Sequence, residues 1–101
     1  MNAVACKWKN ETFEGFWFLT NFLREEGFQE KAVKTITEDL TKQYEIYRGV
    51  LGKLFTPHFV VSSLGSGSGA NIDIFHPITQ EKIGYVSFVI NEDKNIEICP
   101  F

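Results

Sequence analysis

The sequence predicts an α+β fold in which two N-terminal helices pack on one face of a C-terminal antiparallel sheet of about four strands. Apolar residues recur with a helical period before Pro57 and with a period of two after it. The segments after Pro57 also follow one another through short connections, which is typical of an antiparallel meander. A length of 101 residues predicts one domain, residues 1–101, and 44% hydrophobic residues indicate a packed core rather than disorder.

The first helix is predicted within "NETFEGFWFLTNFLREEGF", residues 10–28. Asn10 or Thr12 is its candidate N-cap. At its end, Gly27 is suited to the left-handed position of a Schellman motif, with Phe28 folding back on Leu23. The apolar residues cover more than one stripe, so we expect this helix to be buried on most sides. They are Phe13, Phe16, Trp17, Phe18, Leu19, Phe22 and Leu23.

The second helix is predicted from Gln29 to about Phe55. Its apolar residues recur three and four apart and form a single stripe: Val33, Ile36, Leu40, Tyr44, Tyr47, Leu51 and Leu54. Unbroken, this helix would be about 40 Å long in a domain about 33 Å across. Gly49 and Gly52 are therefore the predicted places for it to bend or end, and Pro57 stops it in any case. A strand within residues 30–45 would contradict this architecture.

Four segments after Pro57 read as strands: "HFVVSSL", "ANIDIFH", "EKIGYVSFVI" and "NIEICPF". Alternation places Ile72 and Ile74 on one face of the sheet and Asp73 and Phe75 on the other. Near the N-terminus, "AVACKWK" at residues 3–9 also alternates, which leaves open whether a further strand pairs at the sheet edge.

Charge and residue spacing exclude several functions. The net charge is −3, and ten Lys and Arg are scattered among thirteen acids, so we expect no direct nucleic-acid partner. The N-terminus lacks signal-peptide features and no long apolar run occurs, so we expect no membrane segment and a soluble, cytoplasmic protein. Cys6, Cys99, His58 and His76 lack metal-binding spacing, and no catalytic set converges in the sequence. We therefore expect no metal site, no cofactor and no catalytic residues.

The stretch "SSLGSGSGAN", residues 62–71, is rich in glycine and serine. A phosphate-binding loop needs a following helix N-terminus and a nearby lysine, but here a predicted strand follows. Besides an anion site, two interpretations stay in view. The stretch is a flexible hairpin connection, or it is a loop that orders on a protein partner through Ser66, Gly67 and Ser68.

Glu38, Asp39 and Glu45 lie on the polar side of the second predicted helix. They are candidate contacts for a basic partner, because complementary charge speeds association, and the alternative is an ordinary solvated face. Ten Phe, two Trp and three Tyr likewise fill the core or form part of an interface.

Two functional hypotheses follow. The first is a non-enzymatic protein-binding module, a small cytoplasmic inhibitor of the immunity-protein type, bacterial or phage in origin, that neutralises a basic partner such as a nuclease toxin. It rests on small size, mild acidity and the surplus of aromatic residues. The alternative is a small-ligand-binding domain or small enzyme with an aromatic-lined pocket between the helices and the sheet. Neither hypothesis assigns an oligomeric state.

Overall fold

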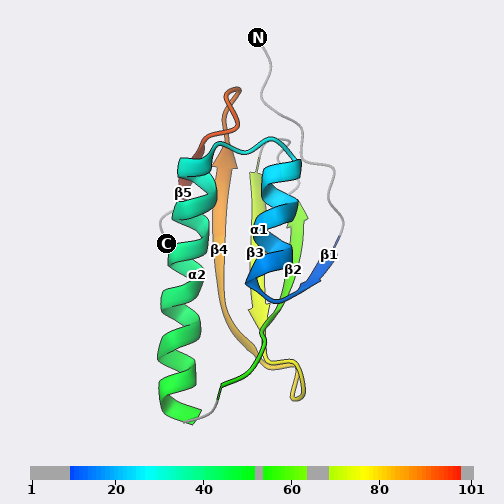
Figure 1. The fold of residues 1–101 in the computed structure, drawn as a ribbon, viewed down its shortest axis with the longest axis vertical. Coiled ribbons are helices and arrows are strands. Elements are labelled where there is room, and N and C mark those ends of the chain that lie inside the picture. The colour runs from blue at the N-terminus through cyan, green and yellow to red at the C-terminus, as the bar shows by residue number, and fades with distance from the viewer. Residues whose placement is uncertain (1–9, 52–53, 64–68, 99–101) are drawn as a thin grey trace.

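The computed structural model describes residues 10–51, 54–63 and 69–98, which form two helices on one face of a five-stranded antiparallel sheet (Figure 1). The strands lie in the sheet in chain order, so each one pairs with its neighbours in the sequence of strands. The predicted α+β fold and the C-terminal meander are confirmed. In chain order the elements are β1 (Glu11–Glu14), α1 (Phe16–Glu25), α2 (Glu30–Leu51), β2 (His58–Ser63), β3 (Gly69–Phe75), β4 (Lys82–Ile90) and β5 (Ile96–Ile98).

The prediction that the first helix begins at Asn10 or Thr12 is wrong. Glu11–Glu14 forms β1, which pairs with β2 at the edge of the sheet, and α1 begins only at Phe16. Gly15 separates them with φ 95° and ψ 158°, and its N–H donates to the carbonyl of Pro57 at 2.8 Å. The pairing partner of β1 lies more than forty residues away in the sequence, and local periodicity does not report such a contact. An N-terminal edge strand therefore exists, but at Glu11–Glu14; the segment "AVACKWK" lies outside the described residues.

The end of α1 has the predicted Schellman geometry. Gly27 has φ 92°, its N–H donates to the Arg24 carbonyl at 3.0 Å, and the Phe28 N–H donates to the Leu23 carbonyl at 3.1 Å. Leu23 and Phe28 are both buried in the same core. The helix therefore ends where the local sequence predicts.

Helix α2 is a single helix of 22 residues. It begins one residue after the predicted start, continues through Gly49 and ends at Leu51, before Gly52. At 1.5 Å per residue its length is about 33 Å, which fits a domain of this size. No strand occurs within residues 30–45, as predicted, whereas residues 54–57 are not helical.

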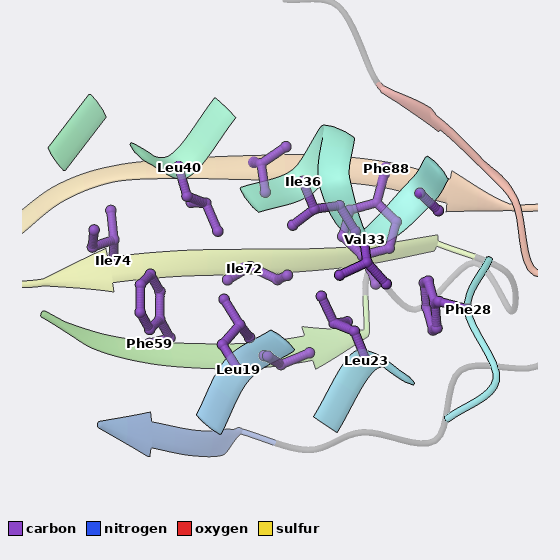
Figure 2. Packing of buried hydrophobic residues seen from close by; sticks show 14 of the residues in the cluster. Leu19, Leu23, Phe28, Val33, Ile36, Leu40, Phe59, Ile72, Ile74 and Phe88 are labelled. Atoms are coloured by element: carbon purple, nitrogen blue, oxygen red, sulfur yellow. The ribbon is translucent and has the colours of Figure 1, made fainter. Parts of the chain in front are cut away.

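The core lies between the helices and the sheet (Figure 2). Ile72 and Ile74 point toward the helices, and Asp73 between them points away, as the alternation predicted. Each such fully buried aliphatic or aromatic side chain stabilises the fold by about 1.5–3 kcal/mol relative to exposure. The buried apolar residues are Leu19, Leu23, Phe28, Ala32, Val33, Ile36, Leu40, Tyr44, Phe59, Val61, Ala70, Ile72, Ile74, Val86, Phe88 and Ile90.

The side-chain amide of Gln43 fastens α2 to the sheet. Its oxygen accepts from the Tyr85 N–H and its nitrogen donates to the Tyr85 carbonyl, both at 2.8 Å. As far as the structure describes it, β5 pairs with Phe88–Ile90, and at Tyr85 the Gln43 amide makes hydrogen bonds of the kind that a neighbouring strand makes. Gly84 leaves the space for it, because a Cβ there would overlap the Gln43 side-chain oxygen.

Candidate functional site

Two large aromatic side chains of α1 are exposed to solvent. Trp17 is 69% exposed and Phe18 is 55% exposed, and their rings meet edge to face with centroids 4.9 Å apart. The expectation that α1 is buried on most sides is therefore wrong. The helix has one helical neighbour, α2, and only Leu19 and Leu23 are fully buried within it. The opposite side of α1 carries its bulkiest aromatic residues into solvent.

Phe13 of β1 and Phe22 of α1 extend this exposed surface toward the sheet edge. Their ring centroids are 4.6 Å apart, and both are only partly buried. Together with Trp17 and Phe18 they form what we call the α1 aromatic surface. A shallow groove of about 530 Å³ runs along it. Contiguous exposed apolar surface of this kind marks interaction sites more often than isolated exposed residues do. The groove is lined by Phe13, Trp17, Phe18, Asn21, Phe22, Arg24 and Glu25.

Residues 10–30, which contain the α1 aromatic surface, are rich in acidic residues. Residues 10–30 carry five glutamates and one arginine, a net charge of −4, compared with −3 for the whole chain. The arginine, Arg24, is paired with Glu30 at 2.9 Å. All five glutamates are exposed, so the surface attracts cationic groups. They are Glu11, Glu14, Glu25, Glu26 and Glu30.

The acids that the sequence singled out on α2 have different surroundings. Glu38 and Glu45 are exposed, and Glu45 pairs with Arg48 at 3.1 Å. Asp39 is half-buried, about 100° around the helix from Glu38, with the Gln43 amide 3.5 Å from its carboxylate. Residues 30–51 contain four acids and four bases, so α2 by itself is electrically balanced.

The predicted loop residues Ser66, Gly67 and Ser68 lie outside the described residues. The strands on either side of them are antiparallel neighbours, with Ser63 opposite Ala70. The segment therefore joins two neighbouring strands of the sheet, and both interpretations of it stay predictions.

The two histidines have different polar partners, although both line one groove of the sheet. His76 accepts from the N–H groups of Ile78 and Thr79 through Nδ1, at 3.1 and 3.2 Å, and so holds the β3–β4 turn. His58 lies on the sheet face away from the helices, with Nε2 3.9 Å from a Glu14 carboxylate oxygen. Within the described ranges, no three His, Asp or Glu side chains are placed to hold one metal ion.

A second groove, of about 420 Å³, crosses this outer face of the sheet. Thr12, Glu14 and His58 line it on the β1 and β2 side, and Phe75 and Pro77 line it on the other. Strand β1 therefore has a groove on each of its two faces.

Tyr47 joins α2 to the β3–β4 turn. Its hydroxyl donates to a Glu81 carboxylate oxygen at 2.6 Å, and this hydrogen bond raises the pKa of Tyr47 above its ordinary value. The neutral phenol is the form that binds Glu81, so the contact holds at neutral pH and is lost as the phenol ionises in alkali. Its position at the surface and its partner indicate a structural role.

The described helices contain no segment that combines the length and apolar character of a membrane span. Comparison with known proteins found no matching family model, no matching curated protein and no matching solved structure.

Sequence reasoning missed the exposure of Trp17 and Phe18 because their helix reads as apolar on nearly every side. One signal was available, since five of the thirteen acids fall within residues 10–30. Fold and surface together describe a packed α+β scaffold that presents exposed aromatic side chains near acidic residues.

Proposed function

We propose that this chain is a non-enzymatic protein-binding module whose partner is a basic protein. The observation that supports this most is the exposure of Trp17, at 69%, beside Phe18 and next to the groove of the α1 aromatic surface. Tryptophan is among the residues most often responsible for interface energy, provided that it becomes buried on binding. The surrounding glutamates favour a positively charged partner and speed its association.

Within this proposal the chain is a small cytoplasmic inhibitor of the immunity-protein type, from a bacterium or phage. A nuclease binds phosphate through clustered Lys and Arg, and an acidic protein surface competes for the same cations. The net charge of −4 over residues 10–30 supports this kind of competition. A scaffold whose core is packed and whose aromatics are already exposed also needs little reorganisation to bind.

The alternative, a ligand-binding domain or small enzyme with a pocket between helices and sheet, has less support. In the described part of the chain, the space between the two layers is occupied by core side chains such as Leu19, Ile36 and Phe59, all 0% exposed. The two grooves beside β1 are open to solvent at the surface.

The double variant Trp17→Ala, Phe18→Ala is expected to bind the partner at least about tenfold more weakly, because it removes both exposed rings from the interface centre. The partner would be captured from the cells in which the chain is native, identified by mass spectrometry and purified for calorimetry. The control is Ile46→Ala, Ile78→Ala, which removes apolar side chains elsewhere that are more exposed than Trp17 and Phe18, at 72% and 84%. Unchanged affinity of the Trp17 and Phe18 variant, or equal loss in the control, would contradict the proposed surface.

The acids of α2 provide a second test. Replacing Glu38, Asp39 and Glu45 by Lys changes the net charge from −3 to +3. Glu38 and Glu45 are exposed, and the half-buried Asp39 makes a 3.5 Å contact with the Gln43 amide. We expect the fold to be retained, because charges near the surface contribute little to stability, and association with a basic partner to slow roughly tenfold at low salt. Surface plasmon resonance at two salt concentrations measures the change.

The matched control replaces Glu92, Asp93 and Glu97, three exposed acids near the β4–β5 turn, and shifts the net charge equally. If the contact includes α2, the α2 variant must lose more of its association rate than this control does. Equal losses would show that Glu38, Asp39 and Glu45 act only through net charge.

A further inference from the structure

Strand β1 is an edge strand, and its hydrogen bonding identifies which backbone groups face outward. Gly15 donates to the Pro57 carbonyl, and the register continues with Phe13 opposite Phe59 and Glu11 opposite Val61. In an antiparallel ladder, hydrogen-bonded pairs alternate with non-bonded pairs. Phe13 and Glu11 therefore bond to β2. Thr12 lies between these two residues and Glu14 lies beside Phe13. The N–H and C=O groups of Thr12 and Glu14 point away from β2, to the side of β1 on which the described residues place no further strand; we call this side the free edge.

The two faces of β1 offer different surroundings to the side chains of an added strand. Phe13 faces the helix side and lines the groove of the α1 aromatic surface. Thr12 and Glu14 line the groove on the outer face, together with His58. Successive side chains of a strand beside β1 would point alternately into these two grooves, because strand side chains alternate with a period of two.

Charge selects among the possible occupants of this edge. Glu11 and Glu14 are both exposed, one on each face of β1. If β1 paired with β1 of a second copy, glutamates would lie opposite or diagonal to glutamates, which is unfavourable. A strand that carries lysine or arginine would lie beside these glutamates whether it ran parallel or antiparallel to β1.

We propose that the free edge of β1 is a docking site for an extended basic segment of the protein partner, which adds to the sheet beside β1. The proposal rests on the proposed function and specifies its binding mode. Backbone hydrogen bonds with Thr12 and Glu14 give affinity, and the two grooves select alternate side chains. Apolar side chains face the α1 aromatic surface, and cationic side chains face Glu14 and the outer groove.

The full chain would be titrated with a synthetic probe, a short peptide in which lysine alternates with phenylalanine and valine. The matched peptide carries glutamate in place of lysine. We expect the lysine peptide to bind and the glutamate peptide not to bind. In NMR spectra the amide signals of Thr12 and Glu14 should shift, and their hydrogen exchange should slow. Failure of the lysine peptide to bind the unmodified chain would overturn the edge proposal.

The substitution Thr12→Pro removes the outward N–H without touching the hydrogen bonds between β1 and β2, as proline is tolerated at sheet edges. It is expected to weaken peptide binding at least about tenfold, whereas Thr12→Val, which keeps the N–H, stays within about twofold. Circular dichroism checks folding. A second test leaves the protein unchanged and uses two versions of the lysine peptide. One is N-methylated on its odd-numbered residues and the other on its even-numbered residues, so each lacks the N–H groups on one side of the added strand. One of the two must fail to bind.

The edge proposal and the proposed function fail in different ways. Docking at the edge is overturned if the Thr12→Pro chain binds the lysine peptide fully and the unmodified chain binds both methylated peptides. In that case, loss of natural-partner binding by the Trp17 and Phe18 variant would still support the α1 aromatic surface as the binding site. Natural-partner binding that survives the change at Trp17 and Phe18 counts against the proposed function itself.

Discussion

Phe59→Ala is expected to lower the free energy of unfolding by about 3–5 kcal/mol, a large part of the total stability of a small domain. Phe59 is 0% exposed at the centre of the core, and its ring packs edge to face on Phe16 with centroids 4.9 Å apart. Truncation leaves a cavity between β2 and α1 that the surrounding side chains fill only in part. Urea unfolding followed by circular dichroism measures the change.

The control for this prediction is Phe75→Ala, the same chemical change on the next strand. Phe75 pairs with His58, lies on the sheet face away from the helices and is only half-buried. We expect a cost of about 1 kcal/mol, since less apolar surface returns to water. Equal costs for the two substitutions would mean that the core does not lie on the helix side of the sheet.

Gly15→Ala is expected to cost about 2–3 kcal/mol, because φ 95° with ψ 158° is a backbone conformation that is essentially restricted to glycine. The added Cβ would also lie 3.3 Å from the Thr56 side-chain methyl, a close contact. Gly15 connects β1 to α1, so strain here acts on the edge strand and on the start of the helix together. Thermal and urea unfolding of the variant measure the loss.

Gly49→Ala is the matched control and has the opposite expected sign. Gly49 lies within α2, and a Cβ there meets no atom within 4 Å. Alanine is favoured over glycine in a helix by about 1 kcal/mol, so this variant should be more stable than the parent. A Gly15→Ala variant as stable as the parent would contradict the turn between β1 and α1.

The sequence alone determined the features that depend on residues close together in the chain. The change of apolar period at Pro57 separates the two helices from the four strands that follow it, because each period belongs to one backbone geometry. The end of α1 at Gly27 was predictable for the same reason, since the Schellman motif joins residues only a few positions apart. Strand alternation likewise assigned Ile72 and Ile74 to the core face before any contact was known.

Only the tertiary structure decided the features from which the functional proposals are built. "ETFE" became a strand because it pairs with β2, more than forty residues away, where it gains ladder hydrogen bonds that no local signal encodes. The same docking left one side of α1 without a neighbour, so Trp17 and Phe18 are exposed although they look like core residues. Burial, strand order and the free edge are properties of the packed chain, because each depends on which distant segment occupies the neighbouring position.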